Sequence, residues 1–143
     1  MKNTIWLLFL MMVTGVSHAG QFKTIKDAEV HYVVFNSTFM TPQIARSYGL
    51  KRNESIATVN ISVLDRSSVG KPAMPAGIKG NAKNLIGQIK TLDFKEIKEG
   101  DAIYYLAQFS ITNEERYQFT IDVDAGMKGR GPISFTQQLY TEK

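Results

Sequence analysis

A strict alternation of apolar and polar residues is the feature that most constrains what this chain can fold into. It is clearest in residues 102–112 and recurs in residues 55–64 and 117–123. Successive side chains of a β-strand point to opposite faces, so a period of two places the apolar residues of a segment on one face. Each segment therefore predicts a strand with one face in the core and one toward water.

The rest of the chain continues this pattern. The single helical signal spans residues 41–49, where Thr41 can cap, Pro42 suits the first helical position and Gly49 suits the exit. Turn residues recur at short intervals, without a linker or an internal repeat. We therefore predict an all-β, immunoglobulin-like antiparallel sandwich of about seven strands with one short helix. The predicted strands are 29–35, 55–64, 78–84, 88–98, 102–112, 117–123 and 133–139.

Three local features refine this prediction. Residues 29–35 are apolar on both faces, which indicates a strand buried on both sides or one that changes sheets. Gly80 weakens its strand and suggests a bulge or a sheet edge. Residues 99–106 resemble the tyrosine corner of immunoglobulin domains, in which Tyr104 would bond back to the backbone. The apolar face of that segment carries Tyr105 instead, so we interpret the likeness as coincidence.

The N-terminus predicts an export signal. Lys2 precedes a run of nine apolar residues, Ile5 to Val13, and Ser17-His18-Ala19 offers small residues at the two positions that signal peptidase reads. A bilayer span takes about 20 apolar residues, so the run is too short for an anchor. Residues 1–19 are thus predicted to be a signal peptide, cleaved after Ala19, and residues 20–143 a single periplasmic domain without a membrane span.

Composition excludes much chemistry. The chain has no cysteine, so disulfides and thiolate sites are absent. Beyond the signal, its Lys and Arg exceed its Asp and Glu by only three, and they are spread out, which argues against nucleic acid as a partner. His31 is the only histidine of the mature chain. It cannot build a zinc site with three or four His or Cys ligands, and no Gly-x-Ser-x-Gly turn is present to complete a serine triad.

Polar residues in two unusual places are candidates for binding. Asn36-Ser37-Thr38 lies between two phenylalanines directly after the doubly apolar strand, and Asn84-Leu85-Ile86-Gly87-Gln88 lies between two predicted strands. Such side chains often satisfy backbone groups in turns, and the alternative is a binding groove. We name no catalytic residue, metal ligand or cofactor. The predicted binding residues are His31, Asn36, Ser37, Thr38, Asn84 and Gln88.

The mature chain also resembles a family of small exported proteobacterial proteins known only as a domain of unknown function. The segments that carry the resemblance are His31-Tyr32, residues 35–39, residues 60–63, residues 84–88 and residues 96–106. The resemblance implies a periplasmic all-β protein and assigns no activity, substrate or functional residue.

Sequence reasoning favours a non-enzymatic binding or protein-interaction domain of the cell envelope, because β-sandwiches commonly bind through loops and strand edges. An envelope hydrolase that uses His31 with a carboxylate is one alternative. A structural accessory subunit of an envelope complex is another. The expected partner is an envelope protein or an anionic envelope polymer, which Lys128 and Arg130 in a glycine-rich turn could contact.

Overall fold

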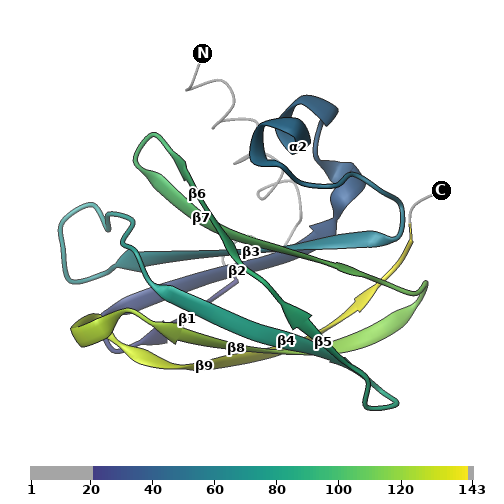
Figure 1. Cartoon of the computed structure of the whole chain (residues 1–143). Helices are drawn as coiled ribbons and strands as arrows, with labels where there is room; N and C mark the ends of the chain where they lie inside the picture. Colours follow the sequence, from purple (N-terminus) through teal and green to yellow (C-terminus); the bar gives the residue numbers. More distant parts are fainter. Residues whose placement is uncertain (1–20, 142–143) are drawn as a thin grey trace.

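The computed structural model describes residues 21–141, which form two antiparallel sheets packed face to face (Figure 1). The five-stranded sheet has the order β1-β2-β3-β7-β6 and the four-stranded sheet the order β5-β4-β8-β9. The all-β sandwich is therefore confirmed, and the predicted signal peptide lies outside the described residues. The strands are β1 (Phe22–Ile25), β2 (Ala28–Asn36), β3 (Ile56–Asp65), β4 (Gly77–Asn84), β5 (Ile89–Leu92), β6 (Lys95–Glu99), β7 (Ala102–Ser110), β8 (Glu115–Asp124) and β9 (Arg130–Leu139).

The strand order is that of an immunoglobulin sandwich. With β1 set aside, β2 to β9 follow one another as strands A, B, C, C′, D, E, F and G. They pair as A-B-E-D in one sheet and C′-C-F-G in the other. Strand β1 adds a short antiparallel edge beside β2. The immunoglobulin-like architecture predicted from the alternation is thus confirmed at the level of topology.

The structure has nine strands rather than about seven, for two physical reasons. Strand β1 has only four residues, most of them exposed, so it carries no alternation of buried and polar positions. Residues 88–98, predicted as one strand, are two strands of different sheets, because the chain crosses from β5 to β6 at Asp93 and Phe94.

The core lies between the sheets and is built from the alternating segments. The inward side chains of β3 are fully buried at Ala57, Val59, Ile61 and Val63. Strand β8 contributes Tyr117 and Phe119, against which Phe109 of β7 packs edge-on. Phe135 of β9 stacks on Phe119 with ring centroids 4.8 Å apart. The predicted inner faces of these strands are therefore the observed ones.

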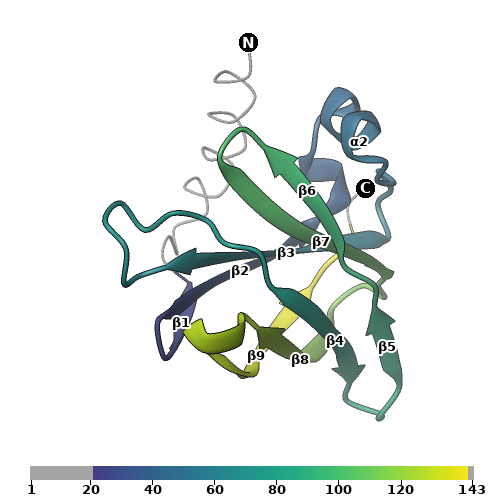
Figure 2. The ribbon, with the colours of Figure 1, turned by 60° about the vertical axis from the view of Figure 1, so that its left-hand side comes forward.

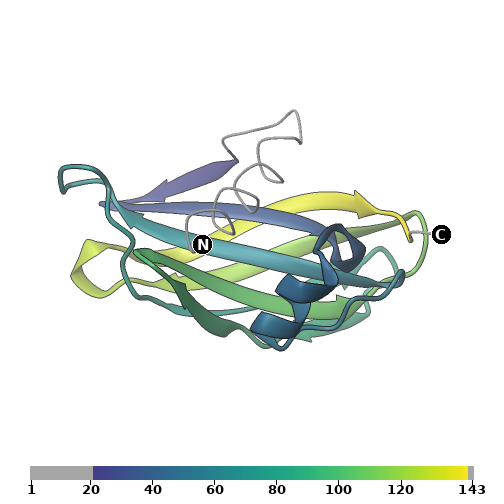
Figure 3. The ribbon, with the colours of Figure 1, turned by 90° about the horizontal axis from the view of Figure 1, so that it is seen from above.

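Strand β2 is buried on both faces, as its composition predicts. Val30 and Val34 point into the core, whereas Phe35 points outward and packs beneath helix α2 (Pro42–Tyr48). The helix has the predicted ends, since Thr41 Oγ1 accepts the Ile44 N–H at 3.1 Å and Gly49 exits at φ 68°. Figure 3 shows α2 toward one end of the sandwich and the β3–β4 connection at the other.

The tyrosine-corner contact of this fold is made by Tyr117 and not by the segment that resembles it in sequence. Tyr117 lies near the start of β8, the F strand, and its hydroxyl accepts the Thr112 N–H at 3.3 Å, five residues upstream. The same hydroxyl donates to Glu115 Oε1 at 2.6 Å. Tyr104 lies in β7, the E strand, so its segment is not the corner. The likeness of residues 99–106 to a tyrosine corner is therefore a coincidence of sequence, as predicted.

Gly80 marks a close approach between strands and not a sheet edge. Strand β4 is an interior strand, with β5 on one side and β8 on the other. A Cβ at position 80 would clash with the Thr120 carbonyl oxygen and would lie 2.9 Å from Ile121 Cα. Because both neighbours are backbone atoms of β8, only glycine fits here.

We predict that Gly80→Ala lowers the free energy of unfolding by about 2–3 kcal/mol, as expected when an added methyl group forces strands apart. Gly77→Ala in the same strand is the matched control. Its Cβ would make an ordinary contact of 3.7 Å with Asp124 Cβ, so stability should change by less than about 0.5 kcal/mol. Urea unfolding of both variants checks this. Equal stability of the two variants would contradict the close approach.

Burial of the Tyr117 hydroxyl, assisted by its bond to Glu115, raises the pKa of Tyr117 to about 12. The unfolded chain ionises this group near pH 10, so stability falls as the pH rises from about 10 toward 12. Between pH 8 and pH 11 the Tyr117→Phe variant should therefore lose about 1.4 kcal/mol less stability than the wild type. Chemical denaturation at the two pH values measures the difference, and an identical loss in both proteins would refute it.

Candidate functional site

The six predicted binding residues lie in three separate places. His31 is on the outer face of the five-stranded sheet, away from the core. Asn36, Ser37 and Thr38 form the end of β2 and the start of a 3₁₀ turn, Ser37–Phe39. Asn84 and Gln88 flank the tip of the β4–β5 hairpin. The structure therefore does not gather them into one pocket, and each place has its own geometry.

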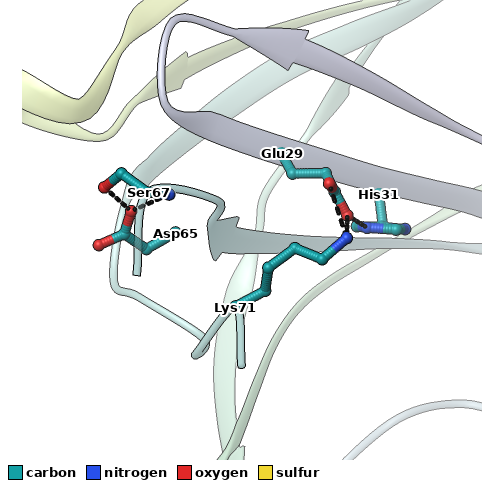
Figure 4. Close-up of polar contacts among 5 residues, drawn as sticks. All are labelled: Glu29, His31, Asp65, Ser67 and Lys71. Carbon is teal, nitrogen blue, oxygen red and sulfur yellow. Dashed lines mark hydrogen bonds and ion pairs between the residues drawn. The ribbon is translucent and has the colours of Figure 1, made fainter. Parts of the chain in front are cut away.

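His31 is part of a charged cluster on β2 (Figure 4). Its Nε2–H donates to Glu29 Oε2 at 2.6 Å, because residues 29 and 31 share one face of the strand. Lys71 of the β3–β4 connection places its Nζ 3.3 Å from the other carboxylate oxygen of Glu29. Phe22 of β1 stacks on the imidazole at a centroid distance of 5.1 Å. Glu29 is thus held between two nitrogen donors.

The charges of this cluster balance one another. The Glu29 side chain is only 8% exposed, and burial alone would raise the pKa of its carboxyl. The hydrogen bonds from His31 and Lys71 outweigh the burial, so the pKa of Glu29 is lowered. The carboxylate therefore stays ionised and anchors both partners. Within residues 21–141, Glu29 is the only hydrogen-bond partner of the His31 imidazole.

Asn36 and Ser37 direct their polar groups inward. The Asn36 amide donates to the carbonyls of Glu54 at 3.0 Å and Tyr140 at 3.1 Å. Its Oδ1 accepts both the N–H and the hydroxyl of Thr38. The Ser37 hydroxyl, which is fully buried, donates to the Asn53 carbonyl and accepts the Asn53 N–H. These contacts are structural, and a binding role for the three side chains stays a prediction.

Asn84 braces the β4–β5 hairpin from within. Its Oδ1 accepts the Gln88 N–H at 2.8 Å, and its amide donates to Gln88 Oε1 at 2.8 Å and Glu115 Oε2 at 3.1 Å. The Gly87 N–H donates to the Asn84 carbonyl, and Gly87 adopts φ 89°. This is a three-residue hairpin loop closed by a left-handed glycine. The predicted pair Asn84 and Gln88 is therefore brought together, as a scaffold for the residues between them.

The hairpin carries an exposed aliphatic tip, which we define as Leu85 and Ile86 in the loop and Ile89 at the start of β5. Their exposed fractions are 82%, 78% and 62%. The five other large exposed hydrophobic residues of the described chain are scattered, whereas these three lie within five residues of one another. Figure 2 shows the hairpin projecting from the body of the sandwich on the side away from α2. Adjacent exposed apolar side chains are a feature that interaction surfaces share.

The basic turn predicted to contact anionic polymers is largely neutralised by internal ion pairs. Lys128 Nζ lies 3.1 Å from Asp65 Oδ2, and Arg130 Nε lies 3.0 Å from Asp124 Oδ1. Hydrogen bonds from the Ser67 and Ser68 side chains lower the pKa of Asp65, so this carboxylate is ionised and fixes the end of the sandwich. Figure 4 shows Ser67 beside it. An anionic polymer as partner stays a prediction.

Sequence reasoning missed Glu29 and the aliphatic tip. Glu29 is two residues before His31 on a predicted strand, so strand periodicity places both on one face and could have indicated the pair. Leu85 and Ile86 belong to the candidate segment 84–88, but only its polar residues Asn84 and Gln88 were predicted to bind. Aliphatic residues at a turn are themselves an unusual signal, because turns favour Gly, Pro, Asn, Asp and Ser.

We predict that Asn36→Ala lowers the free energy of unfolding by about 1–3 kcal/mol, because it removes a buried amide that donates to the carbonyls of Glu54 and Tyr140. Asn81→Ala on the outward face of β4 is the control. Asn81 makes no side-chain hydrogen bond within residues 21–141, so its change should stay within about 0.5 kcal/mol. Thermal melts compare the two, and an unshifted Asn36→Ala melt would remove the structural account of this site.

Within residues 21–141, no group of three or more His, Asp or Glu side chains is placed to hold a metal ion. In the same part of the chain, no helix has the length and hydropathy that crossing a bilayer would take.

Comparison with known proteins connects the chain to a family of proteins and to further solved structures of the same fold. A crystal structure of a DUF4426 family protein from Pseudomonas aeruginosa PAO1 is 35% identical, with a TM-score of 0.76, and covers 86% of this chain and 96% of that one. FetP of uropathogenic Escherichia coli strain F11, recombinantly expressed in the periplasm, is 15% identical at a TM-score of 0.59. That match covers 87% and 95% of the two chains.

A copper-bound variant of FetP is 18% identical at a TM-score of 0.54 and covers 87% of this chain and 90% of that one. Identities this low show a shared fold alone. No curated protein matches the chain. The family model described as a domain of unknown function, DUF4426, matches residues 22–142. Since that match covers most of the sequence, the chain belongs to the DUF4426 family.

Proposed function

We propose that this protein is a periplasmic, non-enzymatic binding domain of the cell envelope and that the β4–β5 hairpin is its binding element. The observation that carries the proposal is the aliphatic tip. Leu85 and Ile86 on the loop and Ile89 at the start of β5 are exposed. Asn84 and Gln88, which flank the loop, are bonded to each other, and Asn84 is also bonded to Glu115. A tip that is already ordered loses little conformational entropy on binding.

The periplasmic address is supported by the sequence and by the fold relative. The first 19 residues have the charge, the short apolar run and the small residues of an export signal. FetP, which shares the fold, was produced in the periplasm. Both observations support export to the periplasm. The described residues contain no cysteine that could form a disulfide, so the stability of the domain comes from sheet packing.

The hydrolase alternative finds one of its parts in the structure. Glu29 orients His31 as a carboxylate orients a general base. A nucleophile is the missing part, because no serine or threonine hydroxyl of residues 21–141 is hydrogen-bonded to His31. Ser62, its cross-strand neighbour, makes no such bond. The binding proposal therefore has the stronger geometric support.

The copper of FetP is not carried over to this chain. The likeness to FetP is one of fold, and copper sites are built from several nitrogen, sulfur or oxygen ligands at one place. In the described part of this chain, His31 and Glu29 are paired with each other and with Lys71, and no third ligand of the His, Asp or Glu type joins them.

The proposal predicts hairpin-dependent binding to envelopes. The exported full-length product is purified, its intact mass is recorded so that the state of residues 1–19 is known, and its sedimentation with bacterial envelope fragments is measured. The double variant Leu85→Ser/Ile86→Ser should bind at least fivefold more weakly. Both positions are exposed, so we expect its melting temperature to stay close to that of the wild type.

Val69→Ser is the matched control, because Val69 is a fully exposed aliphatic residue in a different loop. It should leave binding unchanged. Equal binding of the wild type and the double variant would reject the hairpin as the binding element.

A further inference from the structure

We propose that the component bound by the β4–β5 hairpin is the surface of an anionic lipid bilayer, into which the aliphatic tip inserts. This inference rests on the proposed function and names the partner of the same site. It follows from three observations: the kind of side chain at the tip, the charge of the hairpin that carries it, and the small size of the apolar cluster.

The side chains of the tip suit the boundary between headgroups and acyl chains. Leu85 and Ile86 occupy the turn itself, and Ile89 follows on the outward face of β5. The sequence contains no charged residue between Lys83 and Lys90. The end of the hairpin therefore carries no charged side chain whose removal from water would cost free energy. Its backbone N–H groups at Gly87 and Gln88 are already bonded to Asn84. These two N–H groups would therefore not be left without a hydrogen-bond partner when the turn enters a lipid phase.

The hairpin that carries the tip is cationic. Residues 77–92 contain three lysines and no acidic residue. Lys83 is exposed and pairs across the hairpin with Ile89, so its charge lies at the level of the tip. Lys90 follows directly on β5 and donates to the Ser110 carbonyl, and Lys79 lies farther back, opposite Asp122 of β8. A basic residue held at an anionic membrane surface strengthens binding about fivefold.

The acidic residue that contacts the hairpin through Asn84 is Glu115 of β8. One oxygen of Glu115 accepts the Asn84 amide and the other accepts the Tyr117 hydroxyl. Both carboxylate oxygens are therefore occupied by hydrogen bonds within the fold, and Glu115 is half-buried. The tip and Lys83 therefore present an apolar end with positive charge behind it, which is the arrangement that binds anionic lipid surfaces.

The size of the tip favours a lipid surface over a protein. A stable protein interface buries about 800 Å² on each partner and supplies a packed apolar core. Three aliphatic side chains on a two-stranded projection fall short of this, and the outward residues of β4 and β8 behind them are polar: Asn81, Lys83, Gln118 and Thr120. A bilayer needs no matching groove, and insertion of a few side chains beside basic residues gives weak, reversible binding.

The test uses vesicles of phosphatidylcholine alone and vesicles in which about two-fifths of the lipid is phosphatidylglycerol, with the purified full-length export product. We expect flotation with the anionic vesicles, weakening as salt is raised, and at least tenfold weaker binding to the neutral ones. Leu85→Ser/Ile86→Ser should reduce anionic binding at least tenfold and Lys83→Gln about fivefold. Val69→Ser should bind like the wild type.

Two outcomes would overturn the inference, and they separate it from the proposed function. If envelope fragments bind in a hairpin-dependent way, protease treatment of the fragments abolishes this and anionic vesicles do not bind, the partner is a protein and only the lipid assignment fails. If the double variant binds both envelopes and anionic vesicles as well as the wild type, the hairpin is not the binding element and both proposals fail.

Discussion

Packing of β3 against β8 between the two sheets is the interaction on which the rest of this molecule depends. Each strand is interior to its sheet, and the inward residues of both, from Ala57 to Val63 and from Tyr117 to Val123, are at most 2% exposed. Immunoglobulin domains reinforce this layer with a disulfide between the sheets and a buried tryptophan. Here aromatic side chains take that place, with Phe109, Phe119 and Phe135 in contact across the core.

A core of this kind leaves polar side chains to fix the ends of the sandwich. Asn36 ties β2 to the backbone near both β3 and the C-terminal end, Asp65 ties the β3–β4 connection to Lys128, and Asn84 ties the hairpin to β8. Buried polar groups of this sort are stable because their hydrogen bonds are satisfied internally. The aliphatic tip has no such internal partners, and its three large apolar side chains are exposed.

Much of the fold was predictable because strand alternation reports burial directly. The inner faces of β3, β7 and β8, the doubly buried β2 and both ends of α2 follow from local periodicity and capping residues. Strand β1 was not predictable, since it is held by pairing with β2 and not by a buried face of its own. Two further features could not be predicted for a related reason, namely the change of sheet at Asp93 and Phe94 and the requirement for glycine at position 80. Both depend on which strands lie next to each other in the folded protein.

The candidate site was harder to predict, because the identity of a polar residue does not indicate whether its side chain binds a ligand or bonds to the backbone. Asn84 and Gln88 were predicted as binding residues of one segment, and the structure joins their side chains to each other. The residues with no internal role, Leu85 and Ile86, were overlooked since hydrophobic residues are ordinarily assigned to a core. Their exposure is visible only once β4 and β5 are placed as a projecting hairpin.

Insertion of the hairpin tip into an anionic bilayer is the central claim, and the absence of cysteine makes it directly measurable. A single cysteine at position 86 (Ile86→Cys), labelled with a polarity-sensitive fluorophore, reports the environment of the tip, and Val69→Cys labelled in the same way reports a loop on another part of the sandwich. On adding anionic vesicles, the account predicts a blue shift of the label at position 86 and none at position 69. An unshifted label at position 86 on protein that floats with the vesicles would contradict it.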